Sequence, residues 1–173
     1  MYPVKGTKIL VGMSGGVDSA VAAVLLAEQG YECVGVTLRL VPEHPEKSVF
    51  EPCCGLDAAQ DARRICQTLG IPHHVVYAID RFEHEIMEPF VRDYCAARTP
   101  NPCILCNRRV KFAVLYEHAV KTGGGFVAMG HYAQVVERNG RFALRRGVHR
   151  PKDQSYVLAS LTQEQLAHTL FPL

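Results

Sequence analysis

Long apolar runs are absent from this sequence of 173 residues. No stretch approaches the roughly 18 consecutive apolar residues that a membrane-spanning helix needs. The first apolar stretch, Ile9 to Met13, is too short for the hydrophobic region of a signal peptide. The sequence also contains no internal repeat and no low-complexity segment, which argues against repeat architectures. These absences predict a cytoplasmic protein without a membrane partner.

A strong excess of one charge is absent as well. The formal net charge is +2, so the overall charge does not by itself indicate a nucleic-acid partner. A local cationic cluster between residues 138 and 152 consists of Arg138, Arg141, Arg145, Arg146, Arg150 and Lys152. Such a run is usually the solvated face of a hairpin. Because it leads directly into Lys152-Asp153-Gln154, we favour a surface that contacts phosphates.

An export signal is missing, so the seven cysteines are not expected to form a disulfide framework. We expect thiols that are buried, metal-bound or reactive. Cys33 in a predicted strand, Cys66 on the apolar face of a predicted helix, and Cys95 are expected to pack in the interior. Cys53 and Cys54 follow a polar segment, residues 41–52, and their involvement in function stays open.

Apolar periodicity predicts strands that alternate with helices. Strands are expected at residues 8–12, 31–40, 74–79 and 126–129, and helices at residues 19–29, 57–69, 81–97 and 108–121. This alternation is typical of an α/β protein with a doubly wound parallel sheet. A hairpin is predicted around Asn139-Gly140, and a short helix after Thr162, which forms a capping box with Gln165. The length and the apolar fraction of 48% suit one domain over residues 1–173.

The strongest local signal is Ser14-Gly15-Gly16-Val17-Asp18-Ser19, between the first strand and the first helix. Two adjacent glycines let the backbone turn and bring its N–H groups close to a ligand, and a helix N-terminus favours an anion. The segment therefore predicts a phosphate-binding loop. It lacks the Lys-Ser/Thr ending of a Walker A loop and the G-x-G-x-x-G spacing of a dinucleotide-binding fold.

This hexapeptide resembles the pyrophosphate loop of the PP-loop ATP pyrophosphatases, which cleave ATP between its α and β phosphates. The resemblance implies a sheet of the adenine-nucleotide α-hydrolase type, ATP as cosubstrate, and Asp18 as a residue that helps hold Mg²⁺ on the departing pyrophosphate. Such enzymes activate an oxygen atom as an adenylate. The motif leaves the substrate open, because amidotransferases or synthetases such as those that make NAD or GMP use a similar loop and need no reactive cysteine.

A second motif, Thr99-Pro100-Asn101-Pro102-Cys103-Ile104-Leu105-Cys106-Asn107, contains two cysteines. Two prolines stiffen the predicted loop, and a helix is expected to begin at Asn107 or Arg108. A Cys106 thiolate would then lie near a positive helix end and two arginines, an environment that favours a reactive thiol. A bare C-x2-C is also half of a four-cysteine zinc site, whose other half would have to be Cys53-Cys54.

With its flanks, the second motif closely resembles the tRNA-specific 2-thiouridylases, the MnmA family, and the resemblance extends through nearly the whole chain. It rests on Gly12 to Ser19, Cys53-Cys54, Thr99 to Pro102 with Cys106-Asn107, Gly130-His131-Tyr132, and Lys152 to Tyr156. It implies ATP-dependent 2-thiolation of the wobble uridine of tRNA, by adenylation of the C2 oxygen and sulfur transfer through a cysteine. The implied partners are tRNA and a cysteine desulfurase or sulfur-relay protein that donates the sulfur.

The same resemblance implies the residues of the site. Cys106 would be the first catalytic cysteine, and Asp18 would act at the pyrophosphate. The residues implied to bind ATP are Gly12, Met13, Ser14, Gly15, Gly16, Val17, Asp18, Ser19, Leu38 and Gly130. The residues implied to contact tRNA are Asn101, Pro102, Cys103, His131, Lys152, Asp153 and Gln154.

The sequence departs from the family at Cys103, where well-known members carry an aspartate, so a catalytic carboxylate is missing. Two alternatives stay open. Cys103 and Cys106, with a further thiolate, would ligate three irons of a [4Fe–4S] cluster and leave one iron open for sulfide. Alternatively, Cys106 carries a persulfide and Cys103 is a bystander or a partner.

Length is the second departure from the family. The family's chains continue through a second catalytic cysteine, a small central domain and a C-terminal β-barrel, whereas this sequence stops at Leu173. We therefore expect a PP-loop catalytic domain that does not complete a catalytic cycle by itself. A fragment that only binds nucleotide or tRNA is the remaining alternative.

Overall fold

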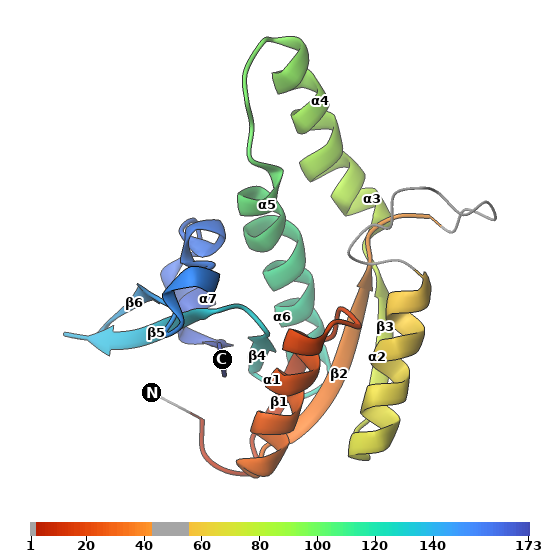
Figure 1. The fold of residues 1–173 in the computed structure, drawn as a ribbon, viewed down its shortest axis with the longest axis vertical. Coiled ribbons are helices and arrows are strands. Elements are labelled where there is room, and N and C mark those ends of the chain that lie inside the picture. Colours follow the sequence, from red (N-terminus) through yellow and green to blue (C-terminus); the bar gives the residue numbers. More distant parts are fainter. Residues whose placement is uncertain (1–2, 43–55) are drawn as a thin grey trace.

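A five-stranded parallel sheet forms the centre of the computed structural model, which describes residues 3–42 and 56–173 (Figure 1). The strand order is β3-β2-β1-β4-β7, and every neighbouring pair is parallel. The strands are β1 (Lys8–Gly12), β2 (Glu32–Arg39), β3 (His73–Tyr77), β4 (Phe126–Met129) and β7 (Thr169–Leu170). The predicted doubly wound α/β fold is confirmed, and only the two-residue edge strand β7 was not expected.

Helices cover both faces of this sheet because alternate residues of a strand point to opposite sides. Leu10 of β1 packs in a cluster with Phe112 and Leu115 of α6 (Phe112–Lys121). On the other face, Ile9 and Val11 pack in a second cluster, with α1 (Val17–Glu28) and α2 (Leu56–Leu69). The sheet is therefore the middle layer of three, as the alternating pattern predicted.

Two of the three cysteines that were expected to pack in the interior do so. Cys33 on β2 and Cys66 on α2 are buried. Burial raises the pKa of Cys33 to about 11 and also raises the pKa of Cys66, so both thiols remain protonated at neutral pH. The prediction for Cys95 was wrong, because this residue ends α4 (Glu88–Cys95) on its exposed side. Cys53 and Cys54 lie outside the described residues.

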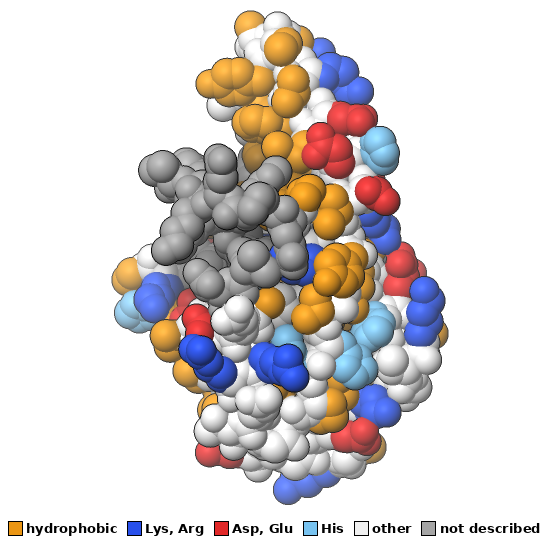
Figure 2. All heavy atoms as spheres, turned by 90° about the vertical axis from the view of Figure 1, so that its right-hand side faces the viewer, with side chains coloured by type: hydrophobic (Ala, Val, Ile, Leu, Met, Phe, Trp, Pro, Cys, Tyr) orange, Lys and Arg blue, Asp and Glu red, His pale blue; other side chains and the backbone are white. Residues whose placement is uncertain are grey.

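A helical arm rises from the carboxyl edge of the sheet (Figure 1). Its ascending part consists of α3 (Ile79–Phe82), a π-helical turn η1 (Glu83–Met87) and α4, which together confirm the helix expected over residues 81–97. Figure 2 shows hydrophobic side chains gathered toward the free end of this arm, where Val91 is 54% and Tyr94 65% exposed. The arm therefore carries apolar surface that the core of the chain does not cover.

The returning part of the arm corrects one expectation. The helix predicted to begin at Asn107 or Arg108 begins at Pro102, and it runs through α5 (Pro102–Leu105), a second π-helical turn η2 (Cys106–Lys111) and α6. Asn101 is the N-cap residue, and its Oδ1 accepts a hydrogen bond from the backbone N–H of Cys103 at 3.2 Å. Proline at the first helical position starts a helix instead of stiffening a loop. Cys106 consequently lies inside a helix and not ahead of one.

The remainder of the chain forms a hairpin and short helices beside β4. Strands β5 (Ala133–Arg138) and β6 (Arg141–Arg146) pair antiparallel, and Asn139 and Gly140 both adopt positive φ in the turn, as predicted. Two 3₁₀ turns follow, η3 (Arg150–Lys152) and η4 (Ser155–Leu158). The capping box of Thr162 and Gln165 begins α7 (Gln163–Ala167), which confirms that prediction. Among the residues that the structure describes, no helix combines the length and the apolar character needed to cross a membrane.

Candidate nucleotide site and adjoining cysteine crevice

The predicted phosphate-binding loop connects β1 to α1. Helix α1 begins at Val17, two residues earlier than expected, so that Asp18 and Ser19 lie in its first turn. The Ser19 hydroxyl donates a hydrogen bond to the Gly16 carbonyl at 2.8 Å and accepts one from the Ser14 N–H at 3.2 Å. The N-cap residue Gly16 has no side chain to cap the helix. The first N–H groups of α1 are therefore left for an anion, as in other helix N-terminal phosphate sites.

Two glycines allow the close packing that holds this loop in place. Gly15 has φ of +79°, and a Cβ there would lie 2.5 Å from the carbonyl oxygen of Ala58 on α2. Gly130, just after β4, packs against the first turn of α1, where a Cβ would lie 2.6 Å from the carbonyl carbon of Asp18. Any larger residue at either position would force the backbone apart. The glycines thus fix the loop between α2 and the end of β4.

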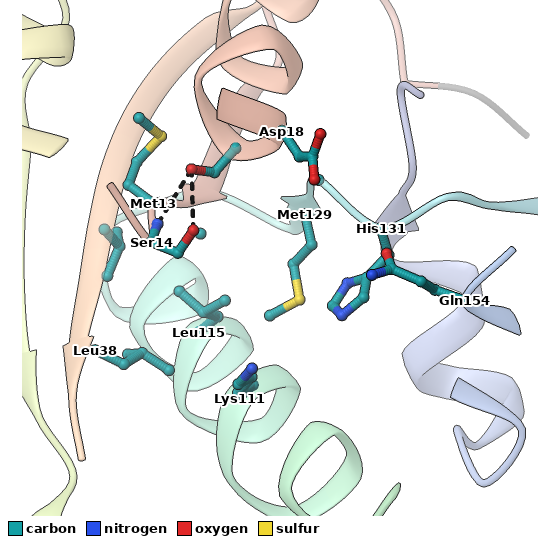
Figure 3. Close-up of a pocket in the computed structure, with 13 residues that line it drawn as sticks. Met13, Ser14, Asp18, Leu38, Lys111, Leu115, Met129, His131 and Gln154 are labelled. Atoms are coloured by element: carbon teal, nitrogen blue, oxygen red, sulfur yellow. Dashed lines mark hydrogen bonds between the residues drawn. The ribbon is translucent and has the colours of Figure 1, made fainter. Parts of the chain in front are cut away.

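A cavity of about 240 Å³ opens beside the loop at the carboxyl edge of the sheet (Figure 3). It brings together seven of the residues implied to bind ATP, and two of those implied to contact tRNA, His131 and Gln154. Gly15, Gly16 and Val17 are not part of its lining, and the side chain of Val17 is 77% exposed. The lining consists of Gly12, Met13, Ser14, Asp18, Ser19, Val36, Leu38, Lys111, Leu115, Met129, Gly130, His131 and Gln154.

A hydrogen-bonded chain connects the loop to the segment that follows the hairpin. The Tyr132 hydroxyl donates to Oδ1 of Asp18 at 2.9 Å and accepts from the Lys152 ammonium at 3.4 Å. The same ammonium lies 5.0 Å from the centre of the Tyr132 ring. The backbone N–H of Gln154 donates to the carbonyl of Tyr132 at 2.9 Å, and Oε1 of Gln154 accepts a hydrogen bond from the backbone N–H of Tyr132 at 3.1 Å. Residues 152–154 are therefore anchored beside the cavity.

Asp153 has a structural role in this segment. Its carboxylate accepts hydrogen bonds from the backbone N–H of Gly147 at 2.8 Å and from the hydroxyl of Ser155 at 2.9 Å. Because these hydrogen bonds stabilise the ionised carboxylate, they lower the pKa of Asp153, and the bond from Gly147 makes the largest contribution. The carboxylate is thus engaged in holding the turn after the hairpin.

His131 points into the cavity on the side of Lys111 and Met129 (Figure 3). Its Nδ1 atom is buried and has no hydrogen-bond partner among the described residues. Burial, with a smaller contribution from the charge of Lys111, lowers the pKa of His131 to about 4. The imidazole is therefore neutral at pH 7, and its buried Nδ1 is left without a hydrogen bond from the described residues.

A second, apolar crevice contains the two cysteines of the C-x2-C motif. Cys106 is buried on η2, whereas Cys103, one helical turn earlier, is exposed. Neighbouring Asn107 is buried, and its Nδ2 donates to the carbonyl of Cys103 at 3.0 Å, which ties the turn together. The side chains around the crevice are Leu40, Val41, Phe82, Ile86, Met87, Phe90, Pro102, Cys103, Cys106, Asn107 and Lys111.

The surroundings of the cysteines differ from those expected from the sequence. Arg108 and Arg109 are exposed, and Cys106 follows the start of its helix by one turn instead of preceding it. Among residues 3–42 and 56–173, no group of three or more His, Cys, Asp or Glu side chains is arranged to hold a metal ion. The described residues therefore offer two thiols at this place, and the zinc and iron–sulfur alternatives gain no support from them.

Lys111 and Tyr132 are polar residues of the site to which sequence reasoning assigned no role, and the apolar lining residues Val36, Leu115 and Met129 were missed as well. Lys111 lines both the cavity and the crevice, and Tyr132 connects Asp18 to Lys152. The N-cap asparagine and the N1 proline at Asn101-Pro102 were the signal that would have placed Lys111 on the same helix as Cys106. No local signal marks Tyr132 as a partner of Asp18, because the two residues meet only in the folded chain.

A parallel sheet with a phosphate-binding loop and a cavity at its carboxyl edge defines an α/β nucleotide-binding fold of the PP-loop type. The family model described as "tRNA methyl transferase HUP domain" matches residues 7–173. The chain belongs to this family. A solved structure described as a predicted subunit of tRNA methyltransferase from Methanocaldococcus jannaschii has the same fold, with a TM-score of 0.53 at 18% identity, over 96% of this chain and 69% of that chain.

Curated relatives confirm the resemblance to the tRNA-specific 2-thiouridylases. A protein of Clostridium acetobutylicum named "tRNA-specific 2-thiouridylase MnmA" is 46% identical over 166 residues, which are 95% of this chain and 47% of the relative. The protein of the same name from Clostridium perfringens is 51% identical over 95% of this chain and 46% of the relative. The chain thus spans less than half the length of the curated relatives it matches.

Proposed function

We propose that residues 1–173 form the ATP-binding catalytic domain of a tRNA sulfurtransferase, which replaces the C2 oxygen of the wobble uridine with sulfur. One observation carries this proposal: the nucleotide cavity and the crevice of Cys106 are adjacent and share Lys111 as a lining residue. An adenylating enzyme that transfers sulfur needs its nucleotide and its thiol next to each other. The names of the curated relatives support tRNA as the substrate.

The lining of the cavity suits ATP in one orientation. The loop and the first turn of α1 supply Ser14, Ser19 and backbone N–H groups for the phosphates. The opposite wall is apolar, with Val36, Leu38 and Leu115, and suits the adenine ring. In this orientation the α-phosphate lies between the loop and the side of the cavity that Lys111 and His131 line.

Asp18 fits the role of a Mg²⁺ ligand. Its carboxylate lies in the first turn of α1, and only Oδ1 is used by Tyr132. Magnesium in nucleotide sites is usually held by one or two carboxylates together with substrate phosphates. When bound there, the ion would neutralise charge on the departing pyrophosphate.

The first chemical step is adenylation of the tRNA base. The wobble uridine has to be unstacked from the anticodon, because its C2 oxygen cannot reach the cavity otherwise. This oxygen then forms a bond to the α-phosphorus of ATP, and the bond between the α-phosphorus and the bridging oxygen of pyrophosphate breaks. The loop at the N-terminus of α1 stabilises the leaving anion.

Sulfur transfer follows at Cys106. A cysteine desulfurase or a relay protein supplies the sulfur as a persulfide on Cys106. The terminal sulfur attacks C2, and AMP leaves with the former C2 oxygen. A second thiol then attacks the S–S bond, so that 2-thiouridine is released and Cys106 ends in a disulfide. We expect that thiol in the part of the relatives that this chain does not span. The [4Fe–4S] alternative needs more thiolates than Cys103 and Cys106 provide.

The tRNA is proposed to lie across the hairpin and the start of the returning helix. The cationic residues Arg141 and Arg145 lie on the exposed side of β6, while Phe142 and Leu144 between them pack against the core. Such a charged face suits the phosphate backbone. The contacts with the unstacked base would come from residues near the nucleotide cavity and the cysteine crevice, which are Asn101, Pro102, Cys103, His131, Lys152 and Gln154. Asp153 would keep Lys152 and Gln154 in position.

The test measures pyrophosphate release from ATP and Mg²⁺ with a tRNA that carries a wobble uridine. We expect release that depends on this tRNA and that persists in Cys106→Ser, because adenylation precedes sulfur transfer. In the full-length protein with a sulfur donor, Cys106→Ser abolishes 2-thiouridine, measured by mass spectrometry of digested tRNA, while Cys95→Ser does not. Release that requires ammonia or glutamine instead of tRNA would favour a synthetase, and thiolation that survives Cys106→Ser would remove Cys106 from the mechanism.

A further inference from the structure

Lys111 occupies the wall between the nucleotide cavity and the cysteine crevice. It is the last residue of η2, its side chain is half-buried, and it is the residue that both linings have in common. In Figure 3 its ammonium lies at the edge of the cavity, opposite the loop, with His131 to one side. The ammonium of Lys111 is thus placed to contact a ligand in the nucleotide cavity and a group in the cysteine crevice.

The π-helical turn is what places Lys111 beside Cys106. The Phe112 N–H donates to the carbonyl of Asn107, five residues earlier, as in a π turn. Residues five apart in an α-helix, such as Cys106 and Lys111, would be separated by about 140° around the axis. The wider π turn brings them toward one side, and both side chains line the same crevice. Single π-helical turns are frequent at functional sites.

The electrostatic surroundings of Lys111 favour an anionic ligand. Among the described residues, no carboxylate forms an ion pair with Lys111. The neighbouring polar side chain is His131, whose imidazole is neutral at pH 7 and whose Nδ1 has no partner. Within the part of the chain that the structure describes, the half-buried ammonium thus has no ion-pair partner, and the neutral imidazole and the carboxylate of Asp18 line the same cavity. A bound phosphate would supply the counter-charge that Lys111 lacks among the described residues.

We propose that Lys111 contacts the α-phosphate of the nucleotide and, from the same position, the sulfur carried by Cys106. This inference rests on the proposed function and deepens it. The ammonium keeps its proton throughout. It stabilises the negative charge on the α-phosphate oxygens while the uridine oxygen bonds to phosphorus and pyrophosphate leaves, and it then holds the anionic sulfur beside the adenylated carbon.

The nucleotide half of the proposal is tested by binding alone. Calorimetry of the chain with ATP, AMP and adenosine compares Lys111→Met with Lys121→Met, an exposed lysine at the end of α6. Lys111→Met should lower the affinity for ATP and for AMP by roughly tenfold, as expected for the loss of a charge-assisted phosphate contact. It should leave the affinity for adenosine unchanged. Lys121→Met should change none of them. Equal affinities for ATP and AMP in Lys111→Met and in the unaltered chain would overturn the contact with phosphate.

The sulfur half is tested by comparing an anionic and a neutral alkylating reagent. The ratio of iodoacetate to iodoacetamide rates at Cys106, measured by peptide mass spectrometry, cancels differences in accessibility. We expect Lys111→Met to lower this ratio by several-fold and Lys111→Arg to keep it. Exposed Cys95, which lies outside the crevice, is the internal reference in the same molecule. A ratio at Cys106 that is unaffected by Lys111→Met would overturn the contact with sulfur.

The two outcomes are separable from failure of the proposed function. If the binding and alkylation effects are found but no tRNA-dependent pyrophosphate release occurs, Lys111 has the inferred position and the substrate is wrong. If the release occurs and Lys111→Met leaves binding and alkylation unchanged, the function stands and the role of Lys111 is refuted.

Discussion

The hydroxyl of Tyr132 donates a hydrogen bond of 2.9 Å to Oδ1 of Asp18, across 114 residues of sequence. Asp18 lies in the first turn of α1, and Tyr132 follows β4 by three residues. The bond fixes the orientation of the carboxylate that would hold Mg²⁺, and Lys152 donates to the same phenolic oxygen. The orientation of the proposed metal ligand therefore depends on the second half of the chain.

Tyr132→Phe removes this hydrogen bond and leaves the ring in place. We expect the affinity for ATP in the presence of Mg²⁺ to fall by about fivefold, which corresponds to the loss of one ordinary hydrogen bond of about 1 kcal/mol. Calorimetric titration at several Mg²⁺ concentrations measures the effect, which should be largest at low Mg²⁺. Tyr156→Phe is the matched control, because Tyr156 is 61% exposed. An unchanged affinity at every Mg²⁺ concentration would show that Asp18 does not need Tyr132.

Gly130→Ala should separate α1 from the end of β4. The new methyl group would lie 2.6 Å from the carbonyl carbon of Asp18, and backbone has to move to admit it. We expect the free energy of unfolding to fall by about 1–3 kcal/mol, the usual cost of overpacking, together with weaker ATP binding. Urea denaturation measures the first quantity. Gly125→Ala is the control, because a Cβ there meets nothing within 4 Å, and equal stability of the two variants would contradict the prediction.

Because the imidazole of His131 is buried in its neutral form, we expect the free energy of unfolding to fall in mild acid. The pKa of His131 is lowered from 6.5 to about 4 in the folded chain, chiefly by burial. Between these two values the unfolded state binds more protons than the folded state, so stability is complete above pH 6.5 and declines as pH falls toward 4. The contribution that is lost by pH 4 is roughly 3 kcal/mol.

His131→Gln should flatten this decline, measured by denaturation at pH 7 and at pH 4.5. His73 and His118 also have lowered pKa values and contribute a decline of the same sign, so the comparison is between variants at each pH. His149→Gln, at an exposed position, serves as the control. If the His131→Gln chain loses as much stability as the unaltered chain between these pH values, the imidazole is not buried in its neutral form.

The exposed face of the hairpin predicts salt-dependent tRNA binding. Arg141→Gln with Arg145→Gln removes two cations from one side of β6. We expect weaker tRNA binding and a shallower dependence of affinity on salt, by about two units in the logarithmic slope if each arginine contacts one phosphate. Filter binding between 50 and 200 mM salt measures both. Arg64→Gln with Arg92→Gln, exposed on α2 and α4, should behave like the unaltered chain.

Local patterns in the sequence were enough for most of the fold. The apolar strand β1 followed by Ser14-Gly15-Gly16 predicted a phosphate-binding loop, and Asn139-Gly140 predicted a hairpin, because each depends on residues that are neighbours in sequence. The helix at Pro102 was missed although Asn101-Pro102 is a start signal, since the prolines were interpreted as loop residues. Strand β7 has two residues and no periodicity to detect.

The sequence by itself therefore determined the parallel α/β class, the phosphate loop before α1 and a cysteine pair that follows the helix predicted over residues 81–97. Tertiary structure alone decided that Asp18 meets Tyr132, that the nucleotide cavity adjoins the Cys106 crevice, and that Lys111 lines both. The physical reason is that propensities and caps act over a few residues. Contacts across 114 residues arise only when the sheet aligns the ends of its strands at one edge.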